Sequence, residues 1–106
     1  MRYLRRIHFN DLEGYCIYRC NKIMNEYTHV RIWYYRGQFK GYSYVIKLVR
    51  KTKPNSYEKV PFHEIYNHLK KARIDINSRY HSQLDYTKGI EYSLYDSINY
   101  LNGIIE

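Results

Sequence analysis

The chain has 106 residues, including 18 Lys or Arg, 10 Asp or Glu and 15 Tyr, and its formal net charge is +8. A chain of this length is expected to form one domain, spanning residues 1–106, that buries about two-thirds of its surface without metal or disulfide. We expect neither a membrane span nor a secretory signal, because no long apolar segment is present. The two cysteines, Cys16 and Cys20, are too few for a disulfide framework, so we expect reduced thiols and a cytoplasmic protein, in the cytoplasm of a host cell.

The positive charge is concentrated in the first half of the chain. Residues 1–53 hold 12 of the 18 Lys and Arg but only three carboxylates, whereas residues 54–106 hold six basic and seven acidic residues. A local excess of this size attracts polyanions. We therefore expect a basic surface in the first half, the alternative being a charge surplus that only aids solubility.

The first half is predicted to be a sheet. Four segments are predicted to be strands, residues 3–9, 15–23, 29–36 and 42–51. They are rich in aromatic and β-branched residues, and opposite faces alternate along the last two. Turn-forming residues separate the first three segments, and the loop from Gly37 to Gly41 is predicted to be a hairpin connection. Connections this short make consecutive strands antiparallel neighbours.

The second half changes to a helical period. After Pro61, which is favoured at a helix start, apolar residues recur three or four apart at Phe62, Ile65, Leu69, Ala72 and Ile76. A second stripe comprises Ile90, Leu94, Ile98, Leu101 and Ile105. Residues 75–88 are polar and are predicted to form a loop between two helices.

These elements predict an α+β domain in the order β-β-β-β-α-α. A four-stranded antiparallel sheet, residues 1–53, would carry two C-terminal helices, residues 54–106, packed on one face. The side chains that the helices would cover are Ile32, Tyr34, Tyr44, Ile46 and Leu48.

The opposite face of that sheet is the predicted binding surface, because cations and aromatic rings alternate on it. Aromatic rings can stack on unpaired bases while cations contact phosphates. The predicted nucleic-acid or partner-binding residues are Arg31, Trp33, Tyr35, Arg36, Lys40, Lys47 and Lys51. The basic N-terminus, with Arg2, Arg5 and Arg6, would extend this surface or form a separate arm. In the alternative reading, the rings pack beneath a loop or against a partner.

No pattern typical of a metal site is present, and no cofactor is expected. His63 and His68 are five residues apart, about 140° around a helix, whereas zinc metalloproteases place two histidines four apart. Cys16 and Cys20 are separated by three residues, which is not the spacing of a zinc knuckle.

No catalytic motif is present either, so the chain is predicted not to be an enzyme. The alternative is a small metal-independent endoribonuclease, which needs only a general acid or base and a cation for the developing phosphate charge. His29 beside Arg31, or His81 beside Arg79, would supply such a pair.

The composition of the chain resembles that of small accessory proteins of bacteriophages and mobile elements. Runs such as 25–27 (Asn-Glu-Tyr) and Ser93–Tyr100 are typical of AT-rich genomes. In this respect, and as one small domain without a catalytic motif, the chain resembles the anti-CRISPR inhibitors of host defence nucleases. The resemblance implies a protein that grips guide RNA or target DNA of a CRISPR-Cas effector, or blocks the effector at an acidic surface.

We therefore predict a non-enzymatic protein that binds nucleic acid or a nucleoprotein complex, such as a CRISPR-Cas effector, through a basic and aromatic sheet face. The alternatives are the endoribonuclease and a protein-interaction or oligomeric module, including a homodimer that covers the sheet face. The sequence leaves the choice among DNA, RNA and protein open.

Overall fold

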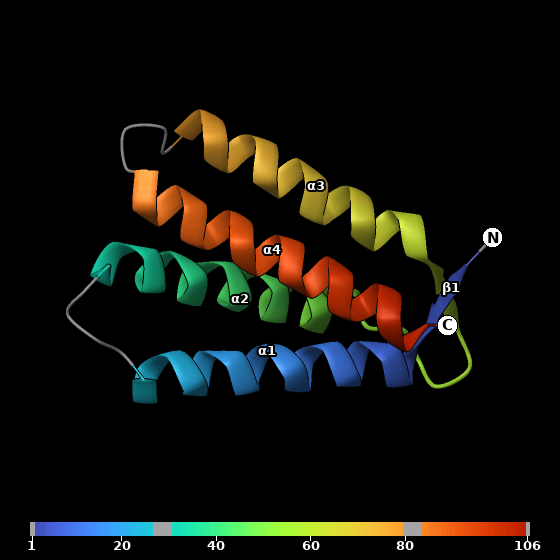
Figure 1. Cartoon of the computed structure of the whole chain (residues 1–106). Coiled ribbons are helices and arrows are strands. Elements are labelled where there is room, and N and C mark those ends of the chain that lie inside the picture. Colours follow the sequence, from blue (N-terminus) through green and yellow to red (C-terminus); the bar gives the residue numbers. More distant parts are fainter. Residues whose placement is uncertain (1, 27–30, 80–83, 106) are drawn as a thin grey trace.

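A computed structural model describes residues 2–26, 31–79 and 84–105 of the chain. These residues form a helical bundle in the order β1 (Tyr3–Arg5), α1 (Arg6–Glu26), α2 (Ile32–Thr52), β2 (Lys59–Pro61), α3 (Phe62–Arg79) and α4 (Leu84–Ile104) (Figure 1). The predicted four-stranded sheet is wrong, because the sheet in the described ranges consists of β1 and β2 alone, paired antiparallel.

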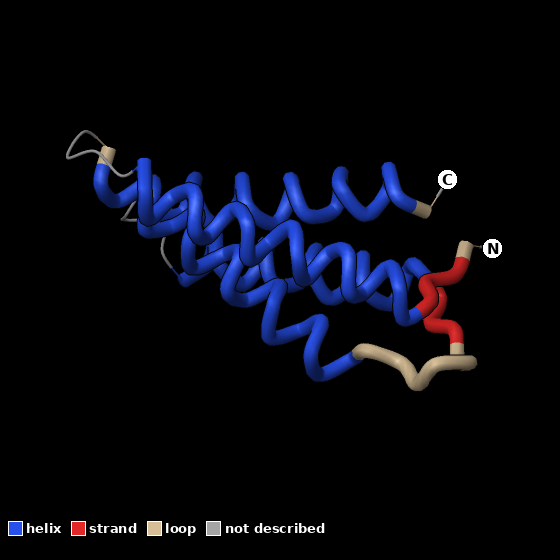
Figure 2. Tube along the Cα trace, turned by 90° about the horizontal axis from the view of Figure 1, so that it is seen from below, coloured by secondary structure: helices blue, strands red, loops and turns tan. Residues whose placement is uncertain are grey.

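Helices α2 and α4 form the centre of the bundle and make its most extensive contact. Helix α1 packs mainly on α2 and α3 packs mainly on α4, so the two outer helices lie at opposite edges in Figure 1. The short β1–β2 ribbon lies at the end of the bundle where both termini are found. Figure 2 shows the loop over residues 53–58, in tan, that returns the chain from α2 to β2.

Helix α1 forms because its buried residues follow a helical period and not an alternating one. The buried side chains are Phe9, Leu12, Cys16, Cys20 and Ile23, spaced three or four residues apart. The strands predicted at 3–9 and 15–23 are therefore wrong except for Tyr3–Arg5, and the turn predicted after the first strand lies inside the helix. At the helix start, the main-chain N–H of Arg5 donates to Nδ1 of His8 at 2.9 Å.

Helix α2 runs unbroken through the segment predicted to be two strands and a hairpin. The strands predicted at 29–36 and 42–51 and the Gly37–Gly41 loop are therefore wrong, with residues 29 and 30 outside the described ranges. The buried residues again follow a helical period: Gly37, Gln38, Gly41, Tyr42, Val45, Leu48 and Val49. The helix ends where the N–H of Lys53 bonds to the carbonyl of Val49, just before Pro54.

The two helices predicted in the second half are present as α3 and α4. Their apolar stripes, including Ile65, Leu69, Ile90 and Leu94, are buried. The loop predicted at 75–88 is too long, because α3 continues to Arg79 and α4 begins at Leu84. These stripes pack on other helices and not on a sheet.

The predicted set of covered side chains is mostly wrong as well. Of the five residues, Leu48 is buried and Tyr44 is exposed, while Ile32, Tyr34 and Ile46 are half-buried. A helix turns by about 100° per residue, so residues two apart in α2 do not share a face. Within the described ranges, no helix combines the length and hydropathy needed to cross a membrane.

Candidate functional site

Five of the seven predicted binding residues share one face of α2. Intervals of three, four, seven and four residues place them within about 60° of arc around the helix. All five are exposed: Trp33, Arg36, Lys40, Lys47 and Lys51. We call this set the α2 stripe. The surface is thus one face of a helix, which corrects the predicted sheet face.

Most of the charge excess of the first half belongs to α2 and its ends, and Arg2 and Arg5 supply the rest. The segment from Arg31 to Lys53 contains seven Lys or Arg and no carboxylate, whereas α1 contains three of each sign. Among the described residues, the ion pairs use Arg31, Arg50 and Lys53, and none uses a cation of the α2 stripe. The four cations of the stripe therefore lack a carboxylate partner in the described part of the chain.

The α2 stripe is long enough to follow a polyanion. From Arg36 to Lys51 it extends about 22 Å along the helix axis, which corresponds to roughly six nucleotide steps of 3.4 Å. Carboxylates bound it on both sides. Glu13 of α1 lies 2.7 Å from Nε of Arg50. On the other side, burial and then the charge of Asp75 of α3 raise the pKa of Tyr44.

Trp33 is the one tryptophan of the chain and lies at the N-terminal end of the stripe. Its side chain is 52% exposed. The guanidinium of Arg36 lies 5.0 Å from its ring centroid, and Tyr86 of α4 contacts the ring edge-on at 6.4 Å. The ring borders a hollow of about 320 Å³ that Leu84, Asp85 and Tyr86 also line. Of the two aromatic rings in the predicted binding set, Trp33 therefore lies in the α2 stripe.

Arg31 and Tyr35 lie apart from the stripe. Arg31 is the N-cap residue of α2, with a φ of 58°, and its guanidinium stacks 4.1 Å above the ring of Tyr34. It also lies 3.9 Å from a carboxylate oxygen of Asp85. Tyr35 is half-buried against the core and lines a cleft with residues of α1. These two side chains do not extend the line of cations.

The basic N-terminal residues are held at the ribbon end of the bundle. Arg2 donates from Nη2 to Oδ1 of Asn102 at 2.8 Å, and its guanidinium lies 4.5 Å from the ring centroid of Phe62. Arg6 donates to the carbonyl oxygen of Pro54 at 3.2 Å. These contacts place Arg2 against the C-terminal end of α4 and Arg6 against the loop that follows α2.

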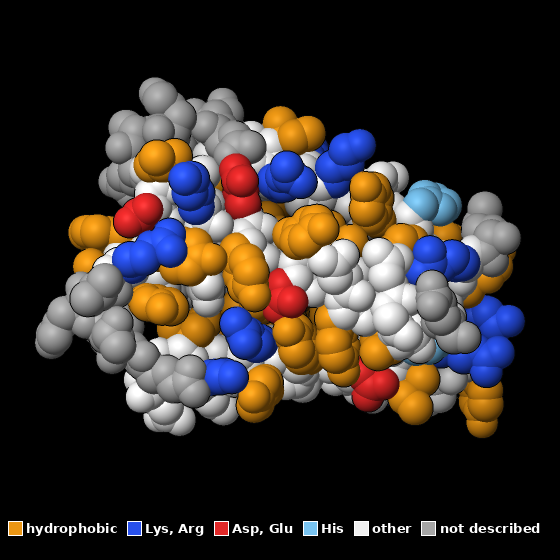
Figure 3. Space-filling model, in the orientation of Figure 1, with side chains coloured by type: hydrophobic (Ala, Val, Ile, Leu, Met, Phe, Trp, Pro, Cys, Tyr) orange, Lys and Arg blue, Asp and Glu red, His pale blue; other side chains and the backbone are white. Residues whose placement is uncertain are grey.

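The face of the bundle that α4 forms differs in its side chains from the α2 stripe. Figure 3 shows mostly hydrophobic and uncharged side chains along its middle, with a group of Lys and Arg side chains at the right-hand end. Tyr92 and Tyr95 are among its exposed residues, at 40% and 58%. Many of the tyrosines therefore lie away from the cations of α2, as part of the helix packing or on another face.

The groups considered for catalysis do not form a centre in the described structure. His29 and His81 lie outside the described residues, and His63 and His68 are exposed on α3. No group of three potential metal ligands occurs among the described side chains. Burial raises the pKa of the Cys16 thiol to about 12, which disfavours the thiolate that a cysteine nucleophile requires.

Comparisons of the chain with models of known protein families, with characterised proteins and with solved structures find no match.

Proposed function

We propose that the chain is a non-enzymatic binding protein that grips nucleic acid, alone or within a nucleoprotein complex, along the α2 stripe. One observation carries the proposal. Seven cations and no carboxylate lie between Arg31 and Lys53, and four of them form an exposed line without ion pairs among the described residues. Such a line matches the regular negative charge of a phosphate backbone.

The mode of binding follows from the helix geometry. A row of cations contacts phosphates in a way that is independent of sequence, and Trp33 is the most exposed aromatic ring of α2 for stacking on a base. The resemblance to anti-CRISPR proteins supports a role as an inhibitor of a host defence nuclease. In that role the α2 stripe would occupy the guide RNA or target DNA of the CRISPR-Cas effector.

Fluorescence anisotropy with labelled RNA and DNA strands at increasing salt tests the proposal. Four phosphate contacts predict a slope of log K against log salt of roughly −3. The triple variant Lys40→Ala, Lys47→Ala, Lys51→Ala should lose most of that slope. Absence of binding at low salt would refute the proposal.

The chain offers a matched control for this triple variant. Lys70, Lys71 and Arg73 are three exposed cations on α3, and their replacement by Ala changes the net charge by the same amount. This control should retain most of the slope. Equal losses in the two triple variants would show that net charge, and not the α2 stripe, attracts the nucleic acid. Intact RNA after incubation in EDTA would agree with a non-enzymatic role.

A further inference from the structure

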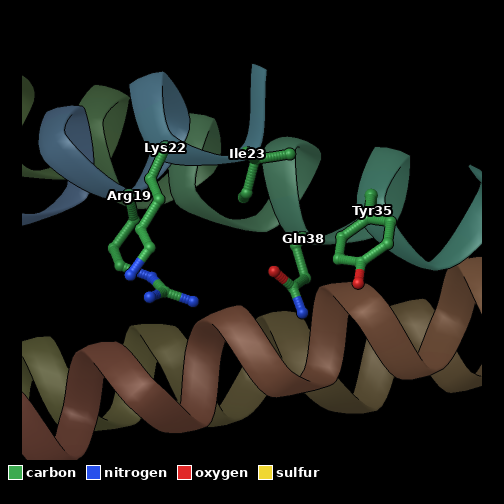
Figure 4. Close-up of a pocket in the computed structure, with 5 residues that line it drawn as sticks. All are labelled: Arg19, Lys22, Ile23, Tyr35 and Gln38. Atoms are coloured by element: carbon green, nitrogen blue, oxygen red, sulfur yellow. The ribbon is translucent and has the colours of Figure 1, made fainter. Parts of the chain in front are cut away.

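A second cationic site lies between α1 and α2, separate from the α2 stripe. A cleft of about 240 Å³ is lined by Arg19, Lys22 and Ile23 of α1 and by Tyr35 and Gln38 of α2. In Figure 4 the polar ends of the four polar side chains point to the same side of the two helices, toward α4. No residue of the α2 stripe lines this cleft.

The cleft contains two positive charges and no carboxylate among its lining residues. Neither Arg19 nor Lys22 forms an ion pair within the described ranges. Arg19 donates from Nε to Oη of Tyr42 at 3.3 Å, and the Tyr42 hydroxyl in turn donates to Asp96. The two terminal amino groups of the Arg19 guanidinium have no hydrogen-bond acceptor among the described residues. An anion between Arg19 and Lys22 would relieve the repulsion of these like charges.

Gln38 distinguishes the cleft from an ordinary pair of surface cations. The residue is only 5% exposed, and its side-chain amide has no hydrogen bond to any other described residue. In Figure 4 the amide projects into the space beside Arg19 and Lys22. No fully buried side-chain nitrogen or oxygen in the described structure lacks a hydrogen-bond partner, so the Gln38 amide reaches the solvent in the cleft and can donate to a ligand there.

We propose that this cleft binds a phosphate group through Arg19, Lys22 and the side-chain amide of Gln38, with the Tyr35 hydroxyl as a further donor. Phosphate oxygens accept hydrogen bonds from several directions, and guanidinium and ammonium groups are their common partners in proteins. The cleft is smaller than the roughly 300–1,000 Å³ of pockets for drug-sized ligands. It therefore suits a small organic phosphate or the terminal phosphate of a nucleic-acid strand.

Titration of the full chain with inorganic phosphate, followed by NMR, tests the site, with sodium chloride at equal ionic strength as the reference. We expect saturable shifts at Arg19, Lys22 and Gln38. The near-isosteric Gln38→Glu places a carboxylate beside the two cations and should abolish the shifts. Lys22→Ala should weaken binding roughly tenfold, the effect of losing one charge-assisted hydrogen bond. Lys70→Ala, an exposed cation on α3 outside both the cleft and the α2 stripe, should leave phosphate binding unchanged.

The proposal is overturned if wild type shows no saturable shift, or if Gln38→Glu and Lys22→Ala both bind phosphate as wild type does. Lys22→Ala keeps the test decisive if Gln38→Glu fails to fold, because it removes only one partly exposed side chain. Circular dichroism establishes the fold of each variant.

Two further arms identify the source of the phosphate. The first arm compares a 5′-phosphorylated strand with the same strand carrying a 5′-hydroxyl. If the wild type prefers the phosphorylated strand and both Lys22→Ala and Gln38→Glu lose that preference, the ligand is a nucleic-acid end. If the two strands bind alike while a nucleoside monophosphate displaces inorganic phosphate, the ligand is a free organic phosphate. The triple variant of the α2 stripe should keep its phosphate shifts, so this proposal and the proposed function fail independently.

Discussion

Gly37 of α2 lies against Gly89 of α4, so closely that a Cβ added to Gly37 would fall 3.1 Å from the Cα of Gly89. The same Cβ would collide with the carbonyl oxygen of Tyr86. Nearby, the Ser93 hydroxyl of α4 donates to the carbonyl oxygen of Gln38 at 2.6 Å. The small residues thus bring the two helix backbones into contact. The α2 stripe lies beside this contact on the exposed part of α2, since Gly37 is one helical turn from Trp33.

Gly37→Ala should destabilise the fold, because the new Cβ meets main-chain atoms that cannot move aside like the end of a side chain. The expected loss in the free energy of unfolding is about 2–3 kcal/mol, the upper part of the range for overpacking. Urea unfolding followed by circular dichroism measures it. Gly14→Ala is the control, because Gly14 lies within α1 and a Cβ there meets nothing within 4 Å. It should stabilise the protein by about 0.5–1 kcal/mol through helix propensity. Equal changes in the free energy of unfolding for the two variants would contradict the close contact between α2 and α4 at Gly37.

The glycines also explain why the fold of the first half was not predictable from its pattern. Gly37 and Gly41 bracket a short polar segment, as in a hairpin, and the aromatic and β-branched residues around them favour strands locally. In the structure both glycines face α4, so packing overrides the local preference. The second half was easier, because its stripes consist of Ile and Leu at a clear helical period.

Much of the candidate surface was predictable although its backbone was not. Residues four apart lie on nearly the same side of both a strand and a helix, which holds for Lys47 and Lys51. Tyr35 is two residues from Trp33, so it shares a strand face but lies about 200° away around a helix. The phosphate cleft combines Arg19 with Gln38, and only the packing of α1 on α2 brings these two residues together.

Tyr42→Phe should destabilise the protein through the carboxylate of Asp96. The hydroxyls of Tyr15 and Tyr42 both donate to Oδ2 of Asp96 at 2.6 Å, and Tyr42 is fully buried. Losing one hydrogen bond to a charged group should cost about 1.5–3 kcal/mol in the free energy of unfolding. Tyr18→Phe is the control, because Tyr18 is 56% exposed and should change stability little. Matching losses in the two variants would show that the Asp96 network contributes nothing.

Alkaline pH should unfold the protein through the same two tyrosines. Burial, followed by the bond to Asp96, raises the pKa of Tyr15 and Tyr42 above the ordinary value of 10.0. The folded state thus retains protons that the unfolded state loses. The resulting stabilisation is complete below pH 10 and is lost as the pH rises from 10 toward the raised values. The urea concentration at the unfolding midpoint, measured at successive pH values above neutral, should decrease as the pH rises above 10. The double variant Tyr15→Phe, Tyr42→Phe should show a shallower fall, and an unchanged pH dependence would contradict the network.

Glu13→Gln should strengthen nucleic-acid binding by α2 while changing stability little. Glu13 accepts from Nε of Arg50 at 2.7 Å and from Nζ of Lys53 at 3.4 Å, and the bond from Arg50 is the main cause of its lowered pKa. This ion pair stabilises the fold above the ordinary pKa of 4.5, and the effect is lost as the pH falls through the lowered value. Because the Arg50 side chain is 62% exposed, removing the pair should cost less than about 1 kcal/mol.

The gain in binding arises because Arg50 and Lys53 lose their carboxylate and become available beside the α2 stripe. One added phosphate contact should steepen the slope of log K against log salt by roughly 0.7–0.9. Asp11→Asn is the matched control, since Asp11 is exposed on α1, forms no ion pair with a described residue and lies about 200° around the helix from Glu13. Anisotropy titrations should therefore show tighter, more salt-sensitive binding for Glu13→Gln than for Asp11→Asn. Identical behaviour of the two variants would mean that nucleic acid responds to net charge and makes no contact at the Glu13 flank of the stripe.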